Sequence, residues 1–280
     1  MTAFATMPCA YNMIYLIASG IFVLVKLYVK PMLLRMSKPS SLIARTFAGT
    51  RKSLAKALVD DATEGCICDD IIFHFDKRLM DQKRLIALAS GALEREEFIL
   101  AKRYFNKDDR IMEFGCGLGV AAARLVKAVQ PASITCLEAN PLAVEYATRL
   151  FSANKMDVNL LQGALGDGSK NFFYACDDYI LSSFDQPLEH DNYTKIEVAT
   201  FALSDVIQRY KPNAIFCDIE GAEQHFCTPD QMDDINKVVI ELHPEVYGKT
   251  VTEQILQNFT DVGFRLIEKL KQTYFFERLV

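Results

Sequence analysis

Hydrophobic and polar positions along this chain follow two alternating spacings, which predict strands separated by helices. Short apolar runs bounded by polar residues predict strands at 110–114, 133–138, 158–162, 214–218 and 237–242. Longer stretches with helical spacing predict helices at 121–129, 141–153 and 251–262. Two last runs, 264–270 and 273–279, predict a closing antiparallel hairpin. The pattern indicates an α/β fold, with a doubly wound, mostly parallel seven-stranded sheet covered by helices on both faces.

Two other stretches differ from this alternation. Apolar residues recur at helical spacing from Leu79 to Phe105, so one or two N-terminal helices precede the sheet. Residues 163–200 are rich in glycine and polar residues, and 171–176 and 195–201 can pair as short strands. We interpret 163–200 as an insertion over the open edge of the sheet. The expected organisation is a hydrophobic segment at 1–40, a basic linker with helices at 41–108, and a main domain at 109–280.

The N-terminal segment is unusually apolar. Residues 1–25 carry no charge, eight Lys and Arg residues lie between Lys26 and Lys56, and the first acidic residue is Asp60. An apolar span followed by basic residues predicts a transmembrane helix at 10–29, a candidate membrane anchor with its C-terminal side in the cytoplasm. Alternatives are a helix packed on the protein, an interfacial helix or a mitochondrial targeting segment.

Composition narrows the class of protein. The 280 residues are 50% hydrophobic with a net charge of −5, which is typical of a globular domain and gives no reason to expect nucleic-acid binding. Several of the eight cysteines fall inside predicted strands, so we interpret them as reduced thiols. Cys66 and Cys68 lack a second Cys or His pair at zinc spacing, and we expect no metal there.

The stretch 111–120 carries the strongest chemical signal. An apolar strand runs into Glu113 and then into glycines at 115, 117 and 119, directly before a helix. Such glycines let the backbone approach a nucleotide-like ligand, and the helix presents free N–H groups. In one register, Gly117-x-Gly119-x-x-Ala122 with Glu138 fits the dinucleotide fingerprint of NAD(P)-dependent oxidoreductases. In the other, Glu113 orients the methionine end of S-adenosylmethionine and Glu138 takes its ribose hydroxyls.

A second group of chemical residues follows two later strands. Asp218, Glu220 and Glu223 follow the strand at 214–218, and Glu241 and His243 end the strand at 237–242. Because the carboxyl ends of parallel strands converge on the ligand crevice, we expect these side chains to crowd near one site. Carboxylates brought together in this way repel each other unless a cation, a proton or hydrogen-bond donors satisfy them.

The chain resembles the FkbM-type family of S-adenosylmethionine-dependent methyltransferases, which have a Rossmann-like sheet. The resemblance runs from Leu85 to Val280 and rests on the motifs Asp218–Glu223, Glu113–Gly119, Ala164–Asp167 and Glu241-x-His243-Pro244. The first loop departs from the commoner family form, which has Asp in place of Glu113 and often Ala-Asn in place of Cys116-Gly117.

The resemblance implies the cofactor S-adenosyl-L-methionine and makes 109–280 the methyltransferase domain. The implied cofactor-binding residues are Glu113, Gly115, Cys116, Gly117, Gly119, Glu138, Ala139, Asn140, Ala164 and Asp218. The adenine is expected near 162–167, and Asp218 close to the transferring methyl group.

The expected reaction is O-methylation of a hydroxyl on a small molecule, a sugar or a lipid-linked acceptor, and lysine or protein methylation is also open. The expected catalytic residues are His243 as first candidate for the base, Asp218 or Glu223 as the second, and Glu220. No resident metal is expected, although Asp218, Glu220 and His243 are a conceivable magnesium site.

Two rival functional classes remain at this stage. One is an NAD(P)-dependent oxidoreductase, and the other is a non-catalytic, membrane-tethered scaffold with a methyltransferase-like fold. We expect membrane association with the catalytic domain facing the cytoplasm. A soluble cytoplasmic or mitochondrial protein is the alternative.

Overall fold

The structure is a computed structural model of the 280-residue chain. It describes residues 13–18, 21–26, 53, 55–56, 63–176, 182, 193–225 and 232–279. The chain divides into two compact units, Met1–Leu93 and Glu94–Val280. Each unit has its own sheet, and the residues predicted to carry the chemistry all belong to the second unit.

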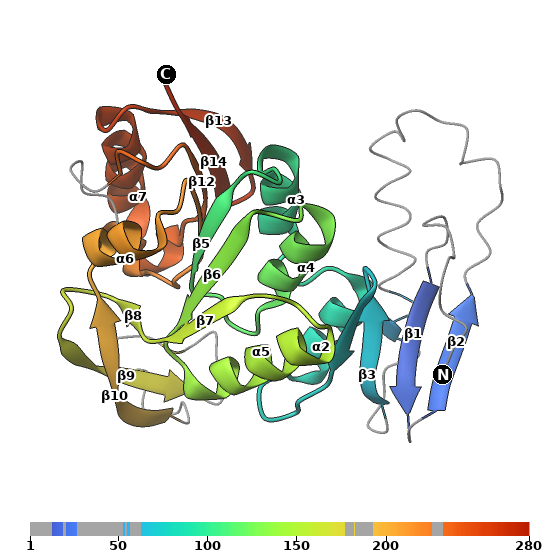
Figure 1. Cartoon of the computed structure of the whole chain (residues 1–280). Helices are drawn as coiled ribbons and strands as arrows, with labels where there is room; N and C mark the ends of the chain where they lie inside the picture. The colour runs from blue at the N-terminus through green and yellow to red at the C-terminus, as the bar shows by residue number, and fades with distance from the viewer. Residues whose placement is uncertain are drawn as a thin grey trace, which may run out of the picture. The chain divides into compact units, whose positions relative to one another are not determined.

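The first unit contains a four-stranded antiparallel sheet with the order β2-β1-β3-β4 (Figure 1). The strands are β1 (Met13–Ala18), β2 (Ile21–Lys26), β3 (Thr63–Cys68) and β4 (Ile71–His74). Helix α2 (Gln82–Ser90) begins at Asp81, whose side chain accepts a hydrogen bond from the Arg84 N–H, and ends at Gly91 in the left-handed conformation.

The transmembrane helix predicted at 10–29 is not supported by the structure. Within that segment the described residues form β1 and β2, which pair from Met13↔Lys26 to Ala18↔Ile21. The segment is rich in β-branched and aromatic residues, which favour strands, and Ser19-Gly20 separates the two runs in the sequence. Among the residues that the structure describes, no helix combines the length and apolar character needed to cross a membrane.

The second unit contains the predicted seven-stranded sheet, with the order β13-β14-β12-β11-β5-β6-β7. Its strands are β5 (Arg110–Phe114), β6 (Ser133–Glu138), β7 (Asn159–Gln162), β11 (Ala214–Cys217), β12 (Lys237–Glu241), β13 (Phe264–Leu270) and β14 (Thr273–Arg278). All neighbours pair in parallel except β14, which is antiparallel to β12 and β13. The strand order reverses between β5 and β11, and ligands bind at such reversal points.

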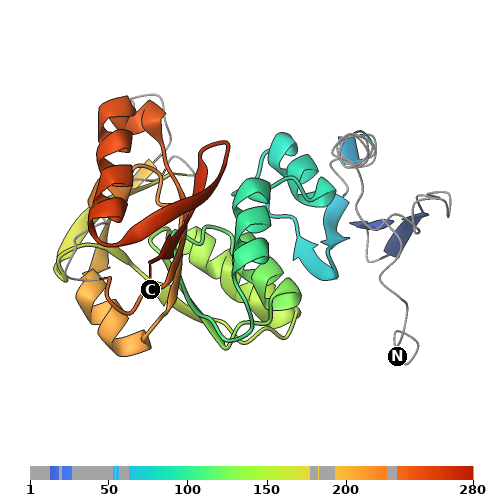
Figure 2. The same cartoon turned by 90° about the horizontal axis from the view of Figure 1, so that it is seen from above.

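Helices cover both faces of this sheet, as Figure 2 shows. They are α3 (Arg95–Tyr104), α4 (Val120–Ala128), α5 (Pro141–Ala153), α6 (Leu203–Tyr210) and α7 (Pro244–Asp261). Helices α6 and α7 pack on the face that carries Met112 and Phe114. Because side chains alternate along a strand, Glu113 points to the opposite face. The doubly wound α/β prediction is therefore confirmed.

The segment interpreted as an insertion forms a small sheet of its own, with the order β8-β10-β9. Strands β9 (Lys170–Cys176) and β10 (Tyr193–Phe201) pair antiparallel, which confirms the predicted pairing, and β8 (Ala164–Leu165) pairs in parallel with β10. Phe173 and Val198 of this ribbon pack on Ala139, directly after β6. The small sheet thus lies at the carboxyl edge of the main sheet, where the cofactor is expected.

Candidate active site

The glycine loop after β5 adopts a backbone that requires glycine. Gly115, Gly117 and Gly119 have φ angles of 77°, 50° and 73°, which L-residues with a Cβ rarely adopt. The N–H of Gly115 donates to the Leu137 carbonyl at 2.9 Å, which fixes the loop to the end of β6. A Cβ at Gly119 would lie 2.6 Å from the Phe151 ring, so α5 packs closely on the start of α4.

Glu138, at the end of β6, holds this loop. Its Oε2 accepts a hydrogen bond from the Gly117 N–H at 2.8 Å, and its Oε1 accepts one from the Asn140 N–H at 2.7 Å. Burial raises the pKa of Glu138, while these backbone hydrogen bonds oppose the shift. Each carboxylate oxygen keeps a second lone pair, so Glu138 can also accept hydrogen bonds from the two hydroxyls of a ribose.

Asn140, Ala139 and Ala164 shape the same edge. The Asn140 Oδ1 accepts a hydrogen bond from the Leu142 N–H at 2.9 Å and so caps α5. Its Nδ2 donates to the Ser182 Oγ at 3.0 Å. Ala139 lies beneath the β9–β10 ribbon, and Ala164 packs against the same cluster. These three residues therefore hold the start of α5 and the β9–β10 ribbon next to the place where the nucleoside is expected.

Glu113 is buried beside two cysteines. Only 1% of the residue is exposed, and its Oε2 accepts a hydrogen bond from the Cys136 thiol at 3.3 Å. Burial raises the pKa of Glu113 to about 8, and the nearby Glu94 adds to the shift. Cys116 is buried next to this pair. At neutral pH the Glu113 side chain is therefore a protonated carboxyl in the absence of a positively charged ligand.

Sequence reasoning missed three charged residues that complete this side of the site. Glu94, before α3, accepts a hydrogen bond from the Ala121 N–H at 2.8 Å, and burial raises its pKa to about 7, with Arg124 opposing the shift. Glu97 is also buried. In a sequence, charged residues in or next to a helix are typical of its solvent-exposed side. The available signal was Arg124, a lone charge in the otherwise apolar run 120–126.

The loop after β11 meets the glycine loop directly. The N–H of Asp218 donates to the Phe114 carbonyl at 3.0 Å. A Cβ at Gly115 would lie only 1.7 Å from the Asp218 carbonyl oxygen, so the two backbones touch at a position where only glycine fits. The structure thus brings together the two groups of residues that the sequence indicated separately.

Glu220, Glu223 and His243 form an ordered network around Asp218. Glu220 has a φ of 52°, a left-handed conformation that is costly for a residue other than glycine and that recurs at functional sites. Glu223 is 0% exposed, and its two oxygens accept hydrogen bonds from the N–H groups of Ile219 and Gly221 at 3.1 and 3.0 Å.

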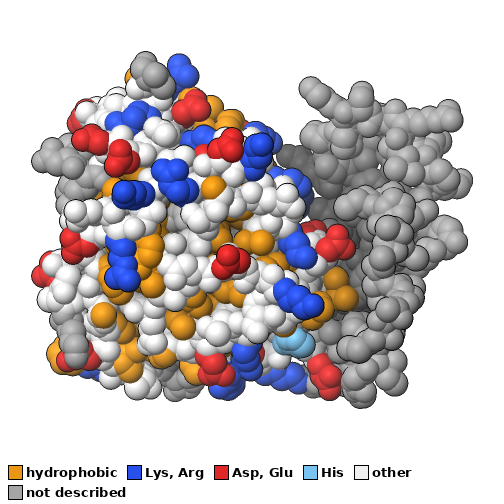
Figure 3. Space-filling view, in the orientation of Figure 1, with side chains coloured by type: hydrophobic (Ala, Val, Ile, Leu, Met, Phe, Trp, Pro, Cys, Tyr) orange, Lys and Arg blue, Asp and Glu red, His pale blue; other side chains and the backbone are white. Residues whose placement is uncertain are grey.

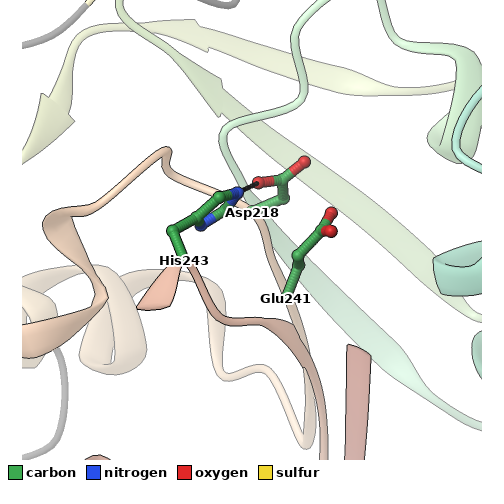
Figure 4. A group of neighbouring side chains, drawn as sticks. All are labelled: Asp218, Glu241 and His243. Carbon is green, nitrogen blue, oxygen red and sulfur yellow. Dashed lines mark ion pairs between the residues drawn. The ribbon is translucent and has the colours of Figure 1, made fainter. Parts of the chain in front are cut away.

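The imidazole of His243 lies between the carboxyls of this network. Its Nδ1 is 3.1 Å from the Glu223 Oε1. Its Nε2 is 3.6 Å from the Asp218 Oδ1, as drawn in Figure 4, and 3.3 Å from the Glu220 Oε2. His243 is buried, with 6% of the residue exposed. Its contact with Glu223 through Nδ1 fixes the direction in which its Nε2 points.

The carboxyls around His243 raise one another's pKa. Burial raises the pKa of Asp218 well above its ordinary value, and Glu220 and Glu241 add to the shift. Burial also raises the pKa of Glu241, to about 8, with the neighbouring carboxyl of Glu97 as a further cause. Burial alone would lower the pKa of His243, but the hydrogen bond to Glu223 and the surrounding carboxylates raise it to about 9. The edge of the sheet therefore favours bound protons or cations.

On the face of the second unit seen in Figure 3, charged side chains of one sign do not gather as the carboxyls around His243 do. Basic and acidic side chains are interspersed there among scattered hydrophobic ones. Of the acidic side chains at the sheet edge, Glu97, Glu113, Glu138 and Glu223 are buried, whereas Asp218, Glu220 and Glu241 are partly exposed.

Residues 96–200 match the family model of the methyltransferase small domain, and no curated protein matches the chain. Among solved structures, the chain is similar to a methyltransferase from Pyrococcus furiosus, with 13% identity, coverage of 85% of this chain and 98% of that one, and a TM-score of 0.45. It is also similar to M. jannaschii TYW2 in complex with AdoMet, with 14% identity, coverage of 75% and 84%, and a TM-score of 0.40.

A third similar structure is a precorrin-6y C5,15-methyltransferase from Geobacter metallireducens, with 11% identity, coverage of 73% and 91%, and a TM-score of 0.40. Such values describe a likeness in fold and carry no information on substrate. Together with the strand order, the family match identifies a Rossmann-like fold with a methyltransferase domain, and it supports S-adenosylmethionine as the cofactor that the sequence predicted.

Proposed function

We propose that this protein transfers the methyl group of S-adenosylmethionine to a hydroxyl oxygen of a small-molecule, sugar or lipid-linked acceptor. The observation that carries the proposal is the backbone contact between Gly115 and Asp218. A nucleoside bound along the glycine loop has its sulfonium next to the loop that carries Asp218. The cofactor and the acidic residues can therefore act on the same atom.

On the cofactor side, Glu138 takes the ribose hydroxyls and Glu113 faces the methionine end. A positively charged amino group beside Glu113 stabilises its carboxylate and reverses the effect of burial. Gly117 and Gly119 leave room for the backbone N–H groups before α4 to approach the ligand. Burial of Glu113 and Glu138 strengthens these interactions because water does not compete for the carboxylates.

On the acceptor side, the hydroxyl oxygen attacks the methyl carbon while the bond from carbon to sulfur breaks. S-adenosylhomocysteine leaves, and the proton of the hydroxyl passes to a base of the protein. We assign this proton to the Asp218 carboxylate, because the backbone of Asp218 contacts the glycine loop along which the cofactor would bind. His243 lies between Glu223, at 3.1 Å from its Nδ1, and Asp218, at 3.6 Å from its Nε2, so we assign His243 and Glu223 to positioning Asp218.

We also propose that the chain is a divergent member of the FkbM-type family. The support is the motif from Asp218 to Glu223, in which Gly221 has a φ of 107° and Glu223 binds back to the loop that carries it. Gly221 and Glu223 thus each have a definite structural part in this protein. We propose an oxygen acceptor because of this resemblance, and because a hydroxyl must lose its proton to a base such as the nearby Asp218.

Calorimetry and label transfer test the proposal. We expect S-adenosylmethionine to bind and NADPH not to bind. Incubation with S-adenosylmethionine labelled at the methyl group and a small-molecule cell extract should label an acceptor. Asp218→Asn should keep cofactor binding and lose about 100-fold or more of the label transfer, whereas the exposed Asp205→Asn should lose none.

Two results would overturn this function. NADPH binding in place of S-adenosylmethionine would support the oxidoreductase. Cofactor binding without transfer to any acceptor fraction would support the non-catalytic scaffold.

A further inference from the structure

We propose that Asp218, Glu241 and His243 bind a divalent first-row transition-metal ion. Asp218 follows β11, Glu241 ends β12, and His243 comes two residues later, so adjacent strand ends bring the three together. Figure 4 shows the three side chains converging, and one ligand atom from each lies within 4.8 Å of the others. Ligand atoms bound at about 2.1 Å from an ion lie roughly 3–4.4 Å apart, so only a small closure is needed.

The imidazole is already oriented as a ligand. The Nδ1 of His243 lies 3.1 Å from the Glu223 Oε1, and Glu223 is itself fixed by two backbone N–H groups. This leaves the Nε2 facing Asp218, at 3.6 Å, and Glu220, at 3.3 Å. Histidines that bind metals usually donate their other ring N–H to a carboxylate, which sets the tautomer and the ring orientation. Glu223 occupies that position here.

Two buried oxygens at the site have no hydrogen-bond partner within the described part of the chain, the Asp218 Oδ1 and the Glu97 Oε2. Glu97 comes from α3, is only 6% exposed, and lies against Glu241. Buried carboxylate oxygens without a donor are costly. A cation bound by Asp218 and Glu241 would compensate the charge of Asp218 directly and that of the neighbouring Glu97 at longer range.

The ligand set favours a particular class of ion. Two carboxylate oxygens and one imidazole nitrogen suit Mn²⁺ and its neighbours in the first transition series, whereas Ca²⁺ and Mg²⁺ prefer oxygen alone. Three protein ligands leave coordination positions open for an acceptor hydroxyl or water. The site itself stands independently of methyl transfer, and only the suggestion that the ion orients the acceptor rests on the proposed function.

Binding of Mn²⁺ to the full chain, followed by electron paramagnetic resonance without cofactor or acceptor, tests the site. We expect one bound ion per chain and pulsed spectra that show coupling to an imidazole ¹⁴N nucleus. Glu241→Gln and His243→Gln should weaken binding by more than about tenfold, and Glu223→Gln by about 10–100-fold. The exposed Glu253→Gln should leave binding unchanged.

The electron paramagnetic resonance spectrum of Mn²⁺ bound to the unmodified protein tests the site even if a variant does not fold. Absence of bound Mn²⁺ at millimolar concentration, absence of ¹⁴N coupling, or unchanged binding in folded Glu241→Gln and His243→Gln would overturn the proposal. Calorimetry with S-adenosylmethionine in metal-free buffer reports separately on the proposed function. Failure of the metal site and failure of the methyltransferase are therefore distinguishable.

Discussion

The backbone of Gly115 lies directly against the backbone carbonyl of Asp218, at a distance that leaves no room for a side chain. The two residues follow neighbouring parallel strands, β5 and β11, which are separated by a hundred residues of chain. The reversal of strand order at this point opens the sheet edge to a ligand. This contact makes one site out of a glycine loop and an acidic loop.

Gly115→Ala should disrupt this contact. The Cβ would lie 1.7 Å from the Asp218 oxygen, at a φ of 77° that is itself unfavourable for alanine. Gly168→Ala is a matched control, because Gly168 has a φ of 88° and no atom within 4 Å of the added Cβ. We expect Gly115→Ala to lower the free energy of unfolding by about 1–3 kcal/mol more than Gly168→Ala, measured in urea. Equal losses would show that only the backbone conformation matters.

Glu138→Gln should weaken cofactor binding while the fold is kept. The substitution removes the charge that accepts hydrogen bonds from the N–H groups of Gly117 and Asn140. A hydrogen bond to a charged group is worth about 1.5–3 kcal/mol, so the Kd for S-adenosylmethionine should rise about 10–100-fold in calorimetry. The exposed Glu145→Gln on α5 serves as control and should not change the Kd. An unchanged Kd in Glu138→Gln would exclude Glu138 from the ribose site.

Glu113 should make the protein less stable as the pH rises. Its pKa is about 8 in the folded protein against an ordinary value of 4.5, so the folded state holds a proton that the unfolded state has released across this interval. The free energy of unfolding should therefore fall between about pH 4.5 and 8, by about 1.4 kcal/mol for each unit of pKa difference at most. Glu94, with a pKa of about 7, contributes in the same direction.

Glu113→Gln should remove a large part of this pH dependence. Urea unfolding at pH 6 and pH 8.5 should show a smaller loss of stability in the variant than in the unmodified protein. Glu145→Gln should reproduce the unmodified profile, since Glu145 is about half exposed. A variant with the full pH dependence would show that Glu113 is ionised in the folded protein.

Asp109→Asn should destabilise the second unit from the opposite edge of its sheet. Both oxygens of Asp109 accept hydrogen bonds from the Lys237 ammonium, at 3.1 and 2.9 Å, and the carboxylate is 4% exposed. Removing one partner of a buried pair costs about 3–5 kcal/mol. Glu253→Gln, which breaks the exposed pair with Lys249, should cost less than about 1 kcal/mol. Similar losses in thermal unfolding would contradict this ranking.

The sequence by itself determined the seven strands of the main sheet, helices α4 and α5, the glycine loop and the two strand ends that carry the acids, but it missed α6 and the first two turns of α7. These features are local: strand and helix spacing, a proline after Asn140, and glycines where φ is positive. It did not reveal the strands of the first unit, because a continuous apolar run such as 13–26 fits a membrane helix as well as a hairpin.

Only the tertiary structure decided which charged groups meet. Glu97 and Arg124 lie on helices and Glu94 directly precedes one, and their spacing along the chain does not tell which side faces the sheet. The sequence predicted that Glu223 and His243 lie near one site, but only the structure shows that they are in direct contact and that Gly115 touches Asp218. Burial sets the pKa of each carboxyl, and burial depends on the packing of the whole unit rather than on neighbouring residues.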